Sequence, residues 1–235
     1  LNVTGVESGA AVQYSTDGGT TWSTGFTAVE GANTVTVRVT DVAGNQASTS
    51  YSFTLDTTTA APTVALTTDS AGSSGTASDR ISNVGTLNVT GVESGAAVQY
   101  STDGGTTWST GFTAVEGANT VTVRVTDVAG NQASTSYSFT LDTTTAAPTV
   151  ALTTDSAGSS GTASDRISNV GTLNVTGVES GAAVQYSTDG GTTWSTGFTA
   201  VEGANTVTVR VTDVAGNQAS TSYSFTLDTT TAAPT

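Results

Sequence analysis

The stretch NTVTVRVTD (119–127) decides the fold, because its residues alternate strictly in character. The valines at 121, 123 and 125 fall on one side of an extended chain, and threonine and arginine fall on the other. A period of two is typical of a half-buried β-strand. The same pattern recurs in PTVALTTD (62–69), LNVTGV (87–92), AAVQYSTD (96–103) and SYSFTLD (136–142). No window has the 3.6-residue period of a helix, so the sequence predicts an all-β fold.

Runs rich in glycine, asparagine and aspartate separate these strands and supply the turns. The DGG turn (103–105) followed by TTW (106–108) predicts a hairpin, with Trp108 packed across it as a core residue. FTAV (112–115) predicts one more strand, which makes about seven per unit. Short strands joined by tight turns indicate an immunoglobulin-like antiparallel β-sandwich.

The segment LNVTGVESGAAVQYSTDGGTTW occurs three times without a substitution, beginning at Leu1, Leu87 and Leu173, so the repeat period is 86 residues. Solenoid repeats run to roughly 20–50 residues, so a period of this length indicates a whole small domain. Pro62 ends a run of small residues that resembles a semi-stiff linker. We therefore expect tandem β-sandwiches in an elongated rod. Their expected bounds are 1–57 (a partial domain lacking its first strand), 58–143, 144–229 and 230–235 (the start of the next repeat).

Composition excludes several classes of function. The chain has no cysteine, histidine or methionine, and 5 basic residues oppose 19 acidic ones, for a net charge of −14. Disulfides, thiolate metal sites and the commonest general base are absent, and nothing is available to neutralise nucleic-acid phosphates. No apolar run approaches the roughly 20 residues of a membrane-spanning helix. Because no signal peptide is present either, we interpret the sequence as a segment of something longer.

The acidic residues follow the ends of the predicted strands. If strands run alternately up and down, Glu93 and Asp127 meet at the lower pole of one domain, where Asp56 arrives from the preceding domain. Grouped carboxylates repel one another unless a cation joins them, and calcium takes 6–8 oxygen ligands in flexible geometry. The sequence therefore predicts a calcium ion at each junction, held by Asp56, Glu93 and Asp127 and again by Asp142, Glu179 and Asp213, with help from Asn131 or Asn217.

A second candidate calcium site is the long first loop, DSAGSSGTASD (69–79). Its two ends, Asp69 and Asp79, would clamp one ion, as would Asp155 and Asp165 in the next copy. The alternative for all of these residues is an aspartate that caps a turn in water. For Asp103 in the DGG turn, the structural role is the favoured interpretation.

The segments LDTTTAAPTVAL, DSAGSSGTASDRISN, YSTDGGTTW and VRVTDVAGNQAS resemble the bacterial immunoglobulin-like extender repeats of giant biofilm and RTX-type adhesins. The likeness covers the whole repeat, although the linker reads DTTTAAP where the family usually reads DTTAP. It implies type I secretion, tethering at the bacterial outer membrane, an extracellular location and stiffening by calcium.

Two functions remain open. The first is a structural extender, because identical copies add length and do not specialise. Its expected partners are calcium and neighbouring repeats of a monomeric array, with no nucleic acid and no membrane insertion. The second is a repeated glycan- or protein-binding module that uses Trp22, Trp108 and Trp194 with avidity. An enzyme is not expected, because the acids lie on turns at opposite poles with no histidine, lysine or cysteine to assist.

Overall fold

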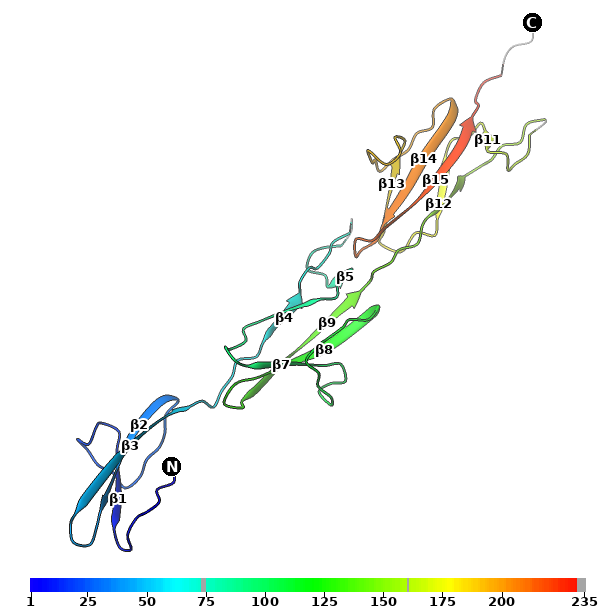
Figure 1. Ribbon diagram of the computed structural model, residues 1–235. Coiled ribbons are helices and arrows are strands. Elements are labelled where there is room, and N and C mark those ends of the chain that lie inside the picture. Colours follow the sequence, from blue (N-terminus) through cyan, green and yellow to red (C-terminus); the bar gives the residue numbers. More distant parts are fainter. Residues whose placement is uncertain (73–74, 160, 232–235) are drawn as a thin grey trace. The chain divides into compact units, whose positions relative to one another are not determined.

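The computed structural model describes residues 1–72, 75–159 and 161–231 (Figure 1). We call residues 1–57, 58–143 and 144–229 the first, middle and third repeats. The described chain forms two compact units. One comprises Leu1–Ala61 with Val92–Val98 and Val125–Ala133, and the other contains the remaining described residues. Regular structure is all strand, and the described residues hold no helix with the length and apolar character that crossing a membrane requires.

The third repeat is built on a four-stranded sheet in the order β11-β15-β14-β13. Its strands are β13 (Ala183–Ser187), β14 (Gly203–Thr212), β15 (Gln218–Leu227) and the two-residue β11 (Ile167–Ser168). β14 pairs antiparallel with both β13 and β15, and it lies beside β15 in Figure 1. β11 pairs parallel with β15, which departs from the expectation of a purely antiparallel fold.

A second, two-stranded sheet covers one face of the first. It consists of β10 (Thr149–Leu152) and β12 (Leu173–Thr176), which pair antiparallel. Val150 and Leu152 of β10 pack on Val207 and Val209 of β14, together with the rings of Tyr223 and Phe225 from β15. The alternate residues of each strand therefore meet between two sheets, and the repeat is a β-sandwich, as the sequence predicts.

The middle repeat has counterparts of all six strands, and the first repeat has counterparts of three of them. In the middle repeat they are β4 (Thr63–Leu66), β5 (Ile81–Ser82), β6 (Leu87–Thr90), β7 (Ala97–Ser101), β8 (Gly117–Thr126) and β9 (Gln132–Leu141). They form sheets in the orders β4-β6 and β5-β9-β8-β7. The first repeat has one sheet, β1-β2-β3, made of β1 (Ala11–Ser15), β2 (Gly31–Thr40) and β3 (Gln46–Leu55).

Two predicted strands are wrong. TTW is not a strand, because only the residue after it, Ser109, makes an isolated bridge with Tyr100. FTAV is also irregular, since the side chain of Asn119 binds both main-chain polar groups of Val115. Phe112 packs edge-on against Phe139, with ring centroids 6.3 Å apart. The segment thus buries its apolar residue and satisfies its backbone without joining a ladder.

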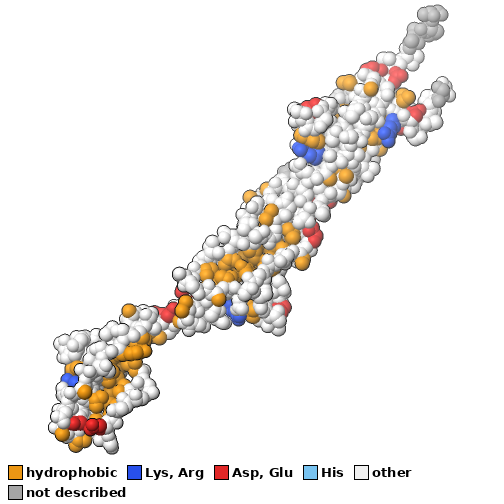
Figure 2. All heavy atoms as spheres, in the orientation of Figure 1, with side chains coloured by type: hydrophobic (Ala, Val, Ile, Leu, Met, Phe, Trp, Pro, Cys, Tyr) orange, Lys and Arg blue, Asp and Glu red, His pale blue; other side chains and the backbone are white. Residues whose placement is uncertain are grey.

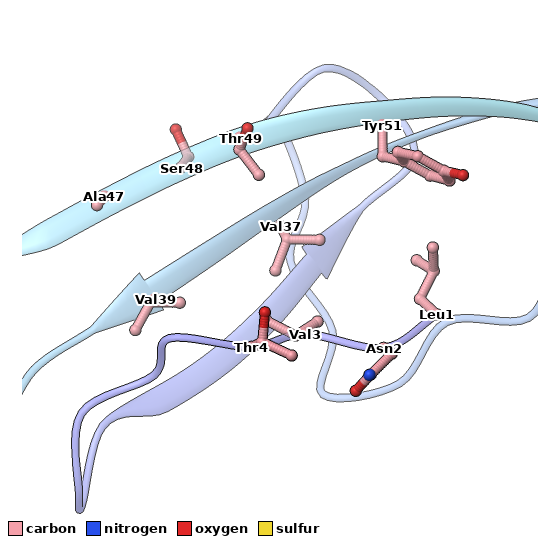
Figure 3. Close-up of a pocket in the computed structure, with 10 residues that line it drawn as sticks. All are labelled: Leu1, Asn2, Val3, Thr4, Val37, Val39, Ala47, Ser48, Thr49 and Tyr51. Atoms are coloured by element: carbon pink, nitrogen blue, oxygen red, sulfur yellow. The ribbon is translucent and has the colours of Figure 1, made fainter.

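The first repeat carries a groove of about 410 Å³ in the place that β4 and β10 occupy elsewhere. Figure 3 shows its wall of β2 and β3 residues, including Val37, Val39 and Tyr51, beside the segment Leu1–Thr4. Tyr51 is 54% exposed, whereas its counterpart Tyr137 is 9% exposed. In the middle repeat, the hydroxyl of Thr135 donates to the carbonyl of Pro62 at 2.6 Å. The described residues of the first repeat contain no equivalent of this acceptor. The groove therefore has the shape and chemistry of a strand site.

We predict that a peptide of sequence APTVALTTD, identical to residues 61–69, binds the 235-residue chain in this groove. By the register of β4 against β6, the peptide should lie antiparallel to Leu1–Thr4, with its valine opposite Val3. Replacing its valine and leucine with serine should weaken binding about 100-fold or more, since burial of each contributes roughly 1.5–3 kcal/mol. Isothermal titration calorimetry measures the affinity of the chain for each peptide. Equal affinity for the two peptides would contradict the assignment of the groove as a strand site.

Candidate metal centre

Two groups of three carboxylates form at corresponding places along the chain. The first acidic cluster is Asp56, Glu93 and Asp127, and the second is Asp142, Glu179 and Asp213. Within each cluster, one carboxylate oxygen from every residue lies within 4.8 Å of the other two. The structure thus brings together both predicted junction sets. In Figure 2, acidic side chains occupy a few small patches on a surface that is mostly uncharged.

Strand ends position the members of the first cluster. Asp56 directly follows β3, Asp127 directly follows β8, and Glu93 lies in the turn that follows β6. Thr59 of the linker donates its hydroxyl to Glu93 Oε1 at 3.1 Å, which holds the glutamate toward the linker. One exit strand and two turns of the next repeat therefore supply the three carboxylates, as the alternation of strand directions predicts.

The DVAGN turn fixes the most buried member of the first cluster. Asp127 Oδ1 accepts the main-chain N–H groups of Gly130 at 2.7 Å and Asn131 at 2.8 Å. Gly130 has a φ of 98°, a left-handed conformation that favours glycine. The side-chain amide of Asn131 donates to Asp127 Oδ2 at 2.8 Å and to the carbonyl of Asp56 at 3.1 Å. Asn131 thus ties the exit of one repeat to the turn of the next.

The second cluster repeats this arrangement. Asn217 donates its amide to Asp213 Oδ2 and to the carbonyl of Asp142, both at 2.8 Å. Thr145 donates its hydroxyl to Glu179 at 3.1 Å. Asp213 is more enclosed than Asp127, at 2% against 7% exposed. The same donors recur, and none of these partners carries a positive charge.

Burial, nearby negative charges and hydrogen bonds shift the pKa values of two cluster carboxylates. Burial raises the pKa of Asp142 above its ordinary value, and the nearby charges of Asp213, Glu179 and Glu116 add to this rise. Burial acts in the same direction on Asp127, but hydrogen bonds from Asn131 and Gly130 outweigh it and lower that pKa. The first cluster therefore favours the ionised form of Asp127, whereas the second cluster opposes the ionisation of Asp142.

The first-loop aspartates hold the backbone of their own loop. Asp69 accepts the N–H of Arg80 at 3.0 Å, and Arg80 has a left-handed φ of 63°. Asp79 accepts from Thr76 at 2.7 Å and from Ile81 at 2.9 Å. Asp155 and Asp165 make the matching bonds in the third repeat. These bonds give the residues a structural role, and the prediction of calcium in this loop stays a prediction.

The DGG turn is a compact cap made by one aspartate. Asp103 accepts hydrogen bonds from the main chain of Thr106 and Thr107 and from the hydroxyls of Thr107 and Ser101, at 2.6–3.0 Å. These bonds, the Thr107 hydroxyl first, hold the pKa of Asp103 far below its usual range. Trp108 is half-buried, with the Arg124 guanidinium 3.9 Å above its ring and its own N–H donated to Gly105. The turn therefore has a structural function.

Comparison with protein families finds this turn as a recurrent motif. Residues 13–24, 99–110 and 185–196 each match the BNR/Asp-box repeat family. The signal for this family in the sequence is the threefold recurrence of STDGGTTW, which the strand and turn patterns alone did not identify. Among curated proteins, no match to the chain is found.

Two solved structures are similar to the chain. One is the crystal structure of a tetra-tandem repeat in the extending region of a large adhesion protein. It has 23% sequence identity and a TM-score of 0.32 and covers 94% of this chain and 67% of that one. The other is a Ca²⁺-stabilized adhesin that helps an Antarctic bacterium reach out and bind ice. Its identity is 24% and its TM-score 0.36, over 84% of this chain and 56% of that one. Both structures are of adhesion proteins.

The raised pKa of Asp142 predicts a pH dependence of metal-free stability. A carboxyl group whose folded pKa exceeds the reference value of 3.8 stabilises the fold fully below that pH. This contribution disappears as the pH rises through the raised pKa. In chelator, wild type should therefore lose stability relative to Asp142→Asn between pH 4 and pH 7. Denaturant titrations at both pH values measure the difference. A constant difference would contradict the prediction.

Proposed function

We propose that this chain is the extender region of a bacterial cell-surface adhesin, in which calcium stiffens the junctions between immunoglobulin-like repeats. The proposed domain bounds are 1–57, 58–143, 144–229 and 230–235. One observation carries the proposal. Each acidic cluster joins the exit residue of one repeat, Asp56 or Asp142, to two turns of the following repeat. A cation bound there would tie consecutive repeats together.

Charge balance supports calcium as that cation. In the part of the chain that the structure describes, the hydrogen-bond donors to the cluster carboxylates are neutral. Three negative charges within 4.8 Å repel one another. A divalent ion removes this repulsion, and hard oxygen ligands favour calcium or magnesium over transition metals. Calcium accepts flexible geometry and direct carboxylate and carbonyl ligands, whereas magnesium demands a near-ideal octahedron and usually retains several waters.

Further oxygen ligands are close to each cluster. In the first cluster, the carbonyl of Asp56 lies 3.1 Å from Asn131 Nδ2. A half-turn of this side-chain amide would present its oxygen to an ion and withdraw its N–H groups. Three carboxylates, a carbonyl and an amide oxygen approach the 6–8 ligands of calcium, and water completes the set.

The identity of the repeats supports an extender role within a larger surface protein. The copies carry no substitution over the residues that they share, so repetition adds length and does not create a new kind of site. We propose that the chain projects a distal binding domain from the cell, outside the outer membrane and after type I secretion, as its likeness to RTX-type biofilm adhesins implies. In this role the chain acts as a non-enzymatic monomeric array.

Calcium should stabilise the chain and narrow its conformational distribution. With a dissociation constant of about 10⁻⁴–10⁻³ M, 10 mM calcium should add about 1.4–2.7 kcal/mol per site. Asp127→Asn should lose the effect at the first cluster and Asp213→Asn at the second. Thermal denaturation measures stability, and X-ray scattering with calcium or chelator measures the maximum dimension.

Asp41→Asn is the matched control for these variants. Asp41 holds its turn through the same bonds to Asn45, at 2.7 and 2.8 Å, yet belongs to neither acidic cluster. It should lose turn stability and keep the whole calcium response. If Asp41→Asn abolished the response as fully as Asp127→Asn, or if calcium left wild type unchanged, the clusters would not be the sites of stiffening.

A second candidate function is glycan binding, because a small cleft recurs beside each tryptophan. The clefts next to Trp22, Trp108 and Trp194 measure about 280, 300 and 260 Å³ and are lined by Tyr, Phe and Thr side chains. Avidity over three copies would make weak sites useful. However, an arginine covers one face of each indole at 3.9 Å, which leaves less ring surface for a sugar.

We therefore expect a glycan array to retain the 235-residue chain no better than its triple Trp→Phe variant. Phenylalanine keeps an aromatic ring under the arginine and removes only the indole edge, so it separates recognition from folding. Reproducible binding that disappears in W22F/W108F/W194F would favour the binding module over the extender.

A further inference from the structure

A glycine-rich strip in the middle repeat contacts a turn of the third repeat. The strip is Ser70–Gly72 with Gly75, and the turn is residues 213–217, between β14 and β15. Gly72 donates its N–H to the carbonyl of Val214 at 2.8 Å, and Ser70 donates its hydroxyl to the carbonyl of Ala215 at 2.6 Å. Both contacts belong to one compact unit.

The strip is preorganised for this contact. Ser70 Oγ accepts the main-chain N–H of Asn83 at 2.8 Å, and Ser70 N–H donates to Ser82 Oγ at 3.2 Å. Ser82 is fully buried and donates its own hydroxyl to the carbonyl of Thr68. These bonds hold Ser70 in place, so its hydroxyl proton is directed outward at Ala215.

Glycine is required here by close approach. A Cβ atom at Gly72 would lie 1.7 Å from the carbonyl oxygen of Asp213, and one at Gly75 would lie 2.3 Å from that of Val214. Real Cβ contacts are never so short, and both neighbours are backbone atoms that have no rotamer to change. The two glycines therefore allow the backbones of successive repeats to touch.

The identical repeats provide an internal comparison. Gly158 occupies the position of Gly72 in the third repeat, and a Cβ there meets nothing within 4 Å. Ala215 is fully buried, whereas its counterpart Ala129 is exposed. Val128 is 83% exposed, while Val214 is partly covered. Because the sequences are the same, contact with the strip accounts for the difference in burial.

We infer that this strip is a docking latch, whose partner is the DVAGN turn of the following repeat. The inference deepens the proposed extender function and rests on its head-to-tail order of repeats. The latch uses main-chain carbonyls as acceptors and involves no carboxylate, so it acts without a cation. It also covers the turn that carries Asp213 and Asn217 of the second cluster. Each junction with a latch thus has a metal-independent contact beside the acidic cluster.

Gly72→Ala against Gly158→Ala in the 235-residue chain tests the latch. Because the chain has no cysteine, Val115→Cys and Val201→Cys place spin labels at equivalent positions, which are 64% and 65% exposed. Double electron–electron resonance then gives the distance distribution between the middle and third repeats. In chelator, Gly72→Ala should broaden this distribution, with an undocked population larger by on the order of 10-fold, while Gly158→Ala should match wild type.

A second pair of variants guards against misfolding. Ser70→Ala removes the bond to Ala215, whereas Ser156→Ala at the equivalent position removes only bonds within its own loop. Both variants lose the hydrogen bond from the main chain of the asparagine in their own loop. Any additional broadening of the distance distribution in Ser70→Ala therefore reports loss of the latch contact. Equal widths within both pairs in chelator would overturn the latch. A missing calcium response with the Gly72 effect intact would instead overturn the calcium proposal, so the two failures are distinguishable.

Discussion

Repulsion between carboxylates that the fold itself brings together is the constraint on which the junctions depend. Each cluster draws one acid from the end of a strand in one repeat and two from turns in the next, with their oxygens within 4.8 Å of one another. The hydrogen-bond donors to these carboxylates, among the described residues, are neutral amides and hydroxyls. Such a group is costly to assemble without a counter-charge and favourable with one. In the proposed function, the ionic composition of the medium would therefore set the stiffness of the junction.

Alternating polar and apolar residues could be recognised in the sequence as strands. Segments whose backbone polar groups bind a side chain could not be recognised as irregular. The valine alternation of β8 predicts both its strand and its buried face, since Val121 and Val123 are fully buried. FTAV has equally strand-like residues, but Asn119 binds both main-chain polar groups of Val115 and replaces a ladder. The two-residue β5 lies in a loop rich in glycine and serine, where propensity carries no strand signal.

The acidic clusters could be anticipated because strand direction alone decides which ends meet. Asp213 directly follows β14, which runs antiparallel to both of its neighbours, so its pole follows from counting strands. The latch could not be anticipated in this way. Gly72 lies in a glycine- and serine-rich segment that looks like any loop in the sequence. A side chain is excluded there because the backbone of another repeat lies too close. Sequence periodicity reports on contacts within a repeat, whereas the fit between repeats depends on their placement.

The latch also explains why one repeat can serve at every internal position. Its donor strip and its acceptor turn are different segments of the repeat, so the contact between neighbours is heterologous. In a heterologous contact, each docked repeat still has its own strip available to bind the following repeat. Such contacts build open arrays when the rotation between units fails to close a ring. Identical copies are therefore sufficient for added length, and a substitution at the position of Gly72 is felt only where another repeat follows.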